Sequence, residues 1–295
     1  MKIACDPDVL FKQGLSITQV VNKIAEWGFK YIEQSPYDRL LPFYKHPKAS
    51  RETVAEYKSA LKNSGLKLSS LLPVYRWSGP DEETRKAAVV NWKRAIQLAV
   101  EMDVNVMNTE LSGDPHQSEK CEAMWYRSIE ELLPIFEREG IRVDIQAHPY
   151  DFIENGYEAA DLVKSLRSDR VTYLYAVPHT FFYDEGKGDV RKMLAYAGRD
   201  LKHIIVADTM NPMKDCRYIL NPPTIQPTHH ATVHQHLGIG EGEVDFDSLF
   251  DQLRKMNFNE EEDTIASISY FGYPEKMDHL APEGLARIQK ELPAE

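Results

Sequence analysis

Short apolar runs alternate with amphipathic stretches along the whole chain. Strand-like runs recur eight times, and each precedes a stretch with apolar residues three and four positions apart. The predicted strands cover residues 2–5, 31–34, 67–72, 104–110, 142–147, 171–176, 203–207 and 264–269. The predicted helices cover residues 17–27, 51–64, 81–102, 119–138, 157–166, 190–197, 247–256 and 282–292. Eight strand–helix units predict an α/β fold, the (β/α)8 or TIM barrel.

The residues that end the predicted helices, and the loops between the repeats, agree with this fold. Gly28, Gly65 and Gly140 directly follow predicted helices, where a left-handed C-cap is expected. The connection over residues 209–242, after the seventh strand, is far longer than usual, which is typical of lids and binding loops. We therefore expect residues 1–295 to form a single TIM-barrel domain whose long loop covers the C-terminal face of the barrel.

The composition restricts the cellular location that we expect for the protein. The longest apolar runs stay well below the roughly 18 residues of a membrane span, and the N-terminal residues lack the hydrophobic region of a signal peptide. The three cysteines, Cys5, Cys121 and Cys216, are widely spaced, so neither a disulfide framework nor a thiolate zinc site is indicated. We expect a cytoplasmic protein with no membrane partner.

The net charge restricts the partners. A formal charge of −11 disfavours nucleic acid, whose binding draws on clustered lysines and arginines that release counterions. A small polar molecule such as a sugar or another polyol remains the expected partner.

Residues 233–242 are the most informative stretch for chemistry. His234 and His236 are two positions apart, and Gly238, Gly240 and Gly242 allow the backbone to bend close to them. Two such histidines can share a metal ion. The alternative is a pair of solvated imidazoles in a loop.

Polar groups at the ends of strands supply the candidate catalytic residues, because TIM-barrel active sites lie at the C-terminal ends of the strands. Glu110 ends the fourth strand and can act as a general base, or pair with Arg76. His148 follows the fifth strand and can move a proton, or cap the loop. Asp208 ends the seventh strand and can anchor a hydroxyl or form a turn with Thr209.

A second group of residues is expected to contact substrate. Guanidinium groups match phosphate or carboxylate geometry, and aromatic faces stack on the apolar face of a sugar or cyclitol ring. The candidates are Glu33, Arg76, Trp77, Gln146 and Arg217, all in or beside segments that follow strands. Solvated loop arginines are the alternative for Arg76 and Arg217.

Residues 238–253, with a Gly-Ile-Gly-Glu-Gly-Glu-Val-Asp-Phe string leading into a helix, carry a family resemblance. Together with the eightfold repeat, they resemble the xylose-isomerase-like TIM-barrel superfamily of sugar isomerases, ketose 3-epimerases and type IV apurinic endonucleases. Within it, residues 31–36, 43–51, 75–81, 108–115 and 233–238 look like the sugar phosphate isomerase/epimerase-like H proteins of inositol-utilisation operons.

The chain departs from the metal cage that the resemblance implies. Epimerases of this superfamily hold a divalent metal with carboxylates and a histidine at the ends of strands five to eight. The matching positions here are Gln146, Ala176, Ile205 and Ser269. A hard cation would be poorly held by this set, so the usual metal-assisted epimerisation at that place is put in doubt.

A different metal set is implied by the endonuclease branch. Its further zinc is bound by an Asp-x-x-His histidine and by an Asp-x-His before a Gly-x-Gly turn, which correspond here to His179, His234 and His236. Three imidazoles suit zinc, and manganese is the other expected ion. The alternative is that these histidines bind sugar hydroxyls directly.

The resemblance implies an isomerase or epimerase of myo-inositol catabolism. It would act on a keto-inositol or a derived keto-sugar by abstracting a proton next to a carbonyl, and a homodimer is a mild expectation. Two alternatives stay open: a sugar-binding relative without turnover, motivated by the lost metal ligands, and a lyase or dehydratase, because enolisation begins both reactions.

Overall fold

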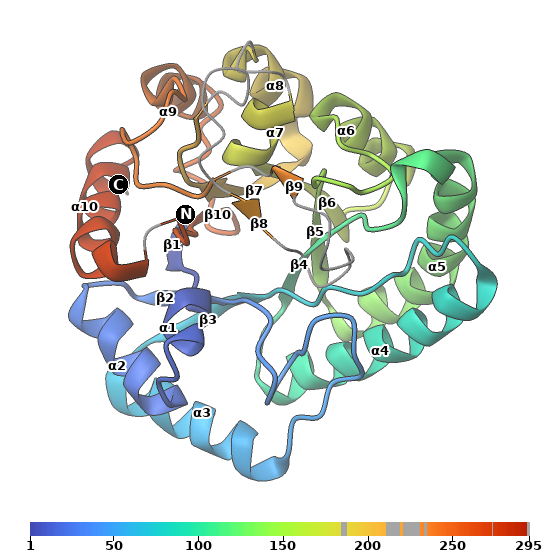
Figure 1. Ribbon diagram of the computed structural model, residues 1–295, viewed down its shortest axis with the longest axis horizontal. Helices are drawn as coiled ribbons and strands as arrows, with labels where there is room; N and C mark the ends of the chain where they lie inside the picture. The colour runs from blue at the N-terminus through green and yellow to red at the C-terminus, as the bar shows by residue number, and fades with distance from the viewer. Residues whose placement is uncertain (184–187, 211–218, 221–230, 233–234, 273, 294–295) are drawn as a thin grey trace.

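Eight parallel strands close into a barrel in the computed structural model, which describes residues 1–183, 188–210, 219–220, 231–232, 235–272 and 274–293. The order around the barrel is β1-β10-β7-β6-β5-β4-β3-β2, so neighbours in sequence are neighbours in space. Figure 1 looks along the barrel, with the strands at the centre and the long helices in a ring around them. The predicted TIM-barrel fold is confirmed.

The barrel strands match the predicted repeat with small shifts at their ends. They are β1 (Lys2–Cys5), β2 (Tyr31–Gln34), β3 (Lys67–Leu71), β4 (Val106–Glu110), β5 (Arg142–Gln146), β6 (Val171–Ala176), β7 (Leu201–Val206) and β10 (Ile265–Ile268). The helices are α1 (Asp8–Lys12), α2 (Ile17–Glu26), α3 (Arg51–Ser64), α4 (Glu82–Glu101), α5 (Ser118–Glu139), α6 (Gly156–Ser165), α7 (Val177–Tyr183), α8 (Val190–Ala197), α9 (Phe246–Lys255) and α10 (Met277–Glu291).

Local signals in the sequence set the helix ends. Ser16 and Gln19 form a capping box at the start of α2, and Asp81 accepts the backbone N–H of Thr84 at the start of α4. Gly65 and Gly140 are left-handed at the C-caps of α3 and α5, as predicted. None of the helices formed by the described residues is long and apolar enough to cross a membrane.

Several elements of the structure differ from the predicted ones. Helix α1 and helix α7 occupy segments predicted as loops, and helix α10 begins five residues before Pro282, the predicted start. Within the long connection after β7, β8 (Ile219–Leu220) pairs with β9 (Ala231–Thr232) in an antiparallel ladder. Elements of two to seven residues are too short to show a hydrophobic period, which explains most of these misses.

The inside of the barrel is layered. Ala4, Val106 and Ile265 form a small apolar cluster, and Leu174, Ala176 and Ile205 form another. The main core lies outside the strands, where their other faces pack against the helices. Polar side chains, described below, occupy the remaining interior positions.

Candidate active site at the barrel mouth

Glu110 lies at the mouth of the barrel, at the end of β4, where it pairs in register with Gln146 at the end of β5. The carboxylate is buried and has two different neighbours. Its Oε1 accepts a hydrogen bond of 3.0 Å from the Tyr44 hydroxyl, and its Oε2 lies 3.4 Å from Nε2 of His148. The structure therefore brings the predicted catalytic pair, Glu110 and His148, into contact.

A second carboxylate, that of Asp151, adjoins this pair. One of its oxygens accepts the backbone N–H of Ser112 at 2.6 Å. Burial raises the pKa of Asp151 well above its usual range, and the nearby charge of Glu110 raises it further. Ligand atoms of Glu110, His148 and Asp151 all lie within 4.8 Å of one another, and they are the one such group of three that could hold a metal ion in the described part of the chain.

A row of imidazoles continues from His148. The rings of His148 and His179 meet edge to face with centroids 4.8 Å apart, and the Nε2 atoms of His179 and His236 are 3.2 Å apart. Helix α7 supplies His179 in its first turn, and His236 stacks on Phe271. Burial lowers the pKa of His236 to about 3 and that of His179 well below its usual value, so both rings are neutral.

The tautomer of His236 follows from its partner. Nδ1 lies 2.7 Å from the backbone carbonyl oxygen of Ser269, which can only accept, so Nδ1 carries the proton. In the neutral ring Nε2 then presents a lone pair toward His179. Two nitrogens bound to one tetrahedral zinc lie about 3.3 Å apart, because Zn–N bonds are about 2.0–2.1 Å. The separation is that of a hydrogen bond from His179 to His236, and it also matches the spacing of two zinc-bound nitrogens.

The metal cage usual in the superfamily does not fit this barrel. Ala176 and Ile205, at two of its positions, belong to the apolar cluster with Leu174. Gln146 is buried with its side-chain oxygen unpartnered, and the Ser269 hydroxyl donates to Asp6 at 2.7 Å. Without charged ligands at these places, the barrel cannot hold a hard divalent ion there.

Asp208 serves as the anchor of a turn. Its two carboxylate oxygens accept backbone N–H groups from Thr209, Gly240, Gly242 and Val244 at 2.8–3.1 Å. A side chain at position 242 would overlap this carboxylate, which explains the glycine. The backbone of Asp208 also pairs with that of Leu237, next to His236. These contacts match the turn-forming alternative for Asp208 rather than a catalytic role.

Glu33 lies in the barrel interior, on β2. It is fully buried, with one oxygen 2.7 Å from Nε2 of His203. The other ring nitrogen of His203 is 3.1 Å from Asp144. This placement does not support the predicted contact of Glu33 with substrate.

Trp77 is also fully buried, and its indole N–H donates to the backbone oxygen of Glu110 at 3.2 Å. Its ring packs against Trp92 and Trp125, so Trp77 supports the end of β4 from behind. Arg76 places its guanidinium 4.6 Å from the centre of the Tyr44 ring. Arg217 and His234 lie outside the described residues.

Tyr44 and Asp151 also belong to the site, although the sequence did not single them out. Tyr44 belongs to the connection between β2 and α3, and Asp151 to the loop after β5. Both follow strand ends, which is the signal that could have found them. Their distance in sequence from the strand ends hid it.

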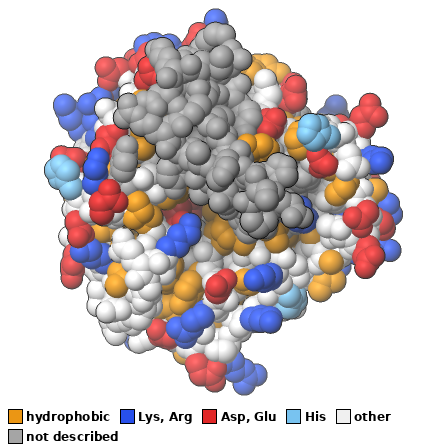
Figure 2. Space-filling view, in the orientation of Figure 1, with side chains coloured by type: hydrophobic (Ala, Val, Ile, Leu, Met, Phe, Trp, Pro, Cys, Tyr) orange, Lys and Arg blue, Asp and Glu red, His pale blue; other side chains and the backbone are white. Residues whose placement is uncertain are grey.

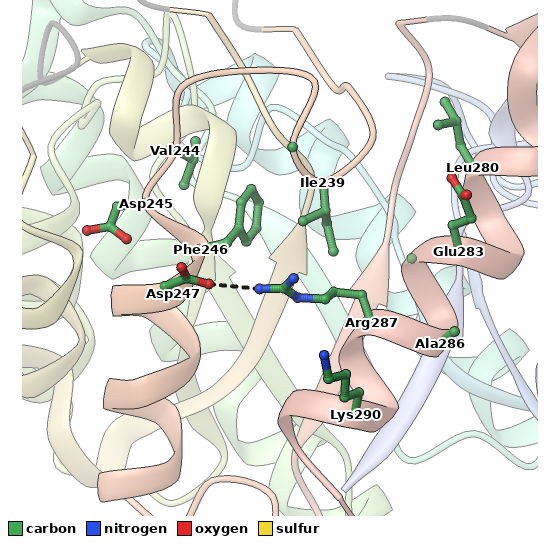
Figure 3. A pocket seen from close by; sticks show the side chains of 12 residues that line it. Ile239, Val244, Asp245, Phe246, Asp247, Leu280, Glu283, Ala286, Arg287 and Lys290 are labelled. Carbon is green, nitrogen blue, oxygen red and sulfur yellow. Dashed lines mark hydrogen bonds and ion pairs between the residues drawn. The ribbon is translucent and has the colours of Figure 1, made fainter.

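The surface away from the barrel mouth carries charged side chains and a groove among the described residues. On the face seen in Figure 2, the acidic and basic side chains of the described residues are interspersed around the rim, and these residues form no single basic patch there. A groove of about 620 Å³ lies outside the barrel between α9 and α10. Figure 3 shows it spanned by the ion pair of Arg287 and Asp247, 2.8 Å apart.

Solved structures share this fold. A D-psicose 3-epimerase determined in the presence of D-fructose is 15% identical, with a TM-score of 0.73 over 99% of both chains. An IolI protein with a bound zinc atom is 15% identical, with a TM-score of 0.69 over 99% of this chain and 96% of that one. The probable 3-DHS dehydratase AsbF of Bacillus anthracis is 15% identical, with a TM-score of 0.74 over 98% and 99%.

A comparison with curated protein sequences finds no match. The family model for the xylose isomerase-like TIM barrel, in contrast, matches residues 21–291. That match spans the repeat from α2 to the last residue of α10. The chain belongs to the xylose isomerase-like TIM barrel family.

Proposed function

We propose that this protein is an isomerase or epimerase that abstracts a proton next to the carbonyl of a small keto-sugar or keto-cyclitol. The observation that carries the proposal is the contact between Glu110 and His148 at the barrel mouth, 3.4 Å from oxygen to nitrogen. A carboxylate beside an imidazole is a common acid–base arrangement. Structures with the same fold include ketose epimerases, which supports this class of reaction.

His148 is the proton acceptor in this proposal. Its Nδ1 lies 2.9 Å from the backbone oxygen of Pro149, which can only accept, so Nδ1 carries a proton, and Nε2, 3.4 Å from Oε2 of Glu110, is the nitrogen that takes up and returns a proton in this proposal. The His148 side chain is 29% exposed and that of Glu110 only 7%, so the imidazole is the group that substrate reaches first. Glu110 stabilises the imidazolium formed by the transfer, and His148 then returns the proton.

The imidazole row binds the reacting oxygens. Zinc or manganese is the proposed ion, held by His179 and His236 together with His234 from outside the described residues. When bound, such an ion polarises a carbonyl as a Lewis acid. The neutral state of His179 and His236 suits both metal binding and direct hydrogen bonds to hydroxyls.

The proposed substrate is a keto-inositol or a keto-sugar derived from it, in the catabolism of myo-inositol. The support is the resemblance of residues 31–36, 43–51, 75–81, 108–115 and 233–238 to proteins of inositol-utilisation operons. We also propose a cytoplasmic location and a homodimer. Contact of Arg76 and Gln146 with substrate stays part of this proposal.

The test is exchange of solvent deuterium into substrate, followed by NMR with keto-inositols and keto-sugars. The expected result is exchange at the carbon next to the carbonyl, reduced at least about 100-fold in the variant His148→Ala. The control is His279→Ala, which removes an exposed histidine on α10 and should leave exchange unchanged.

Two other outcomes would replace the proposal. Ligand-induced thermal stabilisation without exchange would identify a sugar-binding relative without turnover. Loss of water from substrate would identify a dehydratase, a reaction named for one protein of the same fold. Metal analysis of the purified protein, with His236→Ala as the comparison, tests the proposed ion separately.

A further inference from the structure

Tyr44 has an unusual backbone for its side chain. Its φ is 51°, in the left-handed region that residues other than glycine rarely adopt. Its backbone N–H donates to the carbonyl oxygen of Val74 at 3.1 Å. Such strained conformations persist where neighbours hold them, and they cluster at functional sites.

Two side-chain contacts aim the Tyr44 ring at the mouth. The hydroxyl donates to Oε1 of Glu110 at 3.0 Å, and the guanidinium of Arg76 lies over the ring face at 4.6 Å. Burial raises the pKa of Tyr44 far above its usual value, and Glu110 raises it further. The phenol therefore remains a hydrogen-bond donor.

The Tyr44 ring also determines where Arg76 lies. Among the described residues, no ion pair joins Arg76 to Glu110, so the salt bridge considered as an alternative role for Glu110 is not formed. The guanidinium stacks on the Tyr44 ring instead. A direct pair with Arg76 would draw the carboxylate away from His148.

We infer that Tyr44 is a positioning residue of this site, whose hydroxyl holds one oxygen of Glu110 so that the other faces His148. Its ring also keeps the guanidinium of Arg76 off the carboxylate. The inference rests on the proposed function, because the geometry it protects is that of the Glu110 and His148 pair. It adds the β2–α3 connection to the parts of the chain that build the site.

The variant Tyr44→Phe tests the hydroxyl alone, since it keeps the ring and its contact with Arg76. We expect kcat for deuterium exchange to fall by about 10- to 100-fold with KM nearly unchanged, because slight misplacement of a catalytic group has effects of this size. The control is Tyr57→Phe, which removes a buried hydroxyl bonded to Gln34 outside the barrel interior. This control should not change kcat.

A readout independent of turnover separates this inference from the proposed function. The ring ¹⁵N and ¹H NMR signals of His148 should move in Tyr44→Phe and stay in place in Tyr57→Phe, whether or not the tested sugars react. Unchanged His148 signals in Tyr44→Phe would overturn the inference, as would an unchanged kcat. Moved signals without exchange in the wild type would support the positioning role and count against the proposed reaction.

Discussion

Two clusters of histidines and carboxylates lie in the same barrel, and their buried imidazoles differ in charge, because His203 is charged while His179 and His236 are neutral. The core cluster consists of Glu33, Asp144 and His203, and the mouth cluster of Glu110, His148, Asp151, His179 and His236. Burial alone lowers the pKa of His203, but Glu33 and Asp144 on either side raise it to about 9. In the mouth cluster, burial lowers the pKa of His236 to about 3.

The difference lies in the partners and not in the residue types. His203 faces two carboxylates, and Arg142 in turn binds Asp144 at 2.7 and 3.0 Å and keeps its pKa low against the effect of burial. His236 faces a backbone carbonyl and another imidazole. A buried imidazole is thus charged where carboxylates compensate it and neutral where they do not. The first arrangement is a network of buried ion pairs, and the second brings neutral imidazoles into contact with one another.

The largest change in the free energy of unfolding should come from Asp144→Asn, in the core cluster. Removing one partner of a buried charge network leaves Arg142 and His203 partly uncompensated, so we expect a loss of about 3–5 kcal/mol in the free energy of unfolding. The control is Asp263→Asn, which removes the more exposed partner of Arg142 and should cost less than about 1 kcal/mol. Urea denaturation of both variants measures the difference, and equal losses would deny the core cluster its structural role.

The second-largest effect should be a pH dependence of the free energy of unfolding that arises from His203 in the core cluster. The pKa of His203 is 6.5 unfolded and about 9 folded, so its stabilisation is complete below pH 6.5 and disappears as pH rises through 9. A shift of this size corresponds to a change on the order of 3 kcal/mol. Denaturation of the wild type and of His203→Gln between pH 6 and 10 measures it. The variant should lack this alkaline decline, and a decline of the same size in both would rule out His203 as its source.

The barrel could be predicted from the sequence because its strands are buried on both faces. The run of residues 203–207 is then nearly continuous in apolar residues, and helices of ten or more residues show a clear period. Helix α7 could not be predicted in this way, because seven residues with Pro178 near the start carry no such period.

The site was harder to predict, because its contacts join distant segments. Glu110 and His148 follow strand ends, and that rule was enough to find them, whereas His179 and His236 were indicated by the family resemblance and by the spacing of two histidines. The depth of Glu33 depends on the register of β2 against β3 and on a partner, His203, that is 170 residues away in the sequence. Tyr44 depends on a loop conformation that no periodicity encodes.

Substitution of Asp208, which anchors a turn, should change the free energy of unfolding less than substitutions in the core cluster and more than substitutions in the mouth cluster. Asp208→Ala removes the acceptor of four backbone N–H groups, and we expect a loss of about 2 kcal/mol together with faster hydrogen exchange at Gly240 and Gly242. Asp245→Asn is the control, because an asparagine also caps α9. Unchanged exchange at both glycines would show that the turn holds without Asp208.

The smallest effect on stability should come from Glu110→Gln, in the mouth cluster. Glutamine keeps an acceptor for Tyr44 and removes a negative charge beside Asp151, whose pKa is raised first by burial and then by Glu110. We therefore expect the free energy of unfolding to stay within about 1 kcal/mol or to rise, while deuterium exchange falls about 100-fold or more. Urea denaturation and NMR exchange on one preparation measure both. A loss of several kcal/mol in the free energy of unfolding of Glu110→Gln would instead show that Glu110 stabilises the fold, as we expect of the core cluster. Functional groups often lower the stability of a protein, so removing the charge of such a group should not destabilise it.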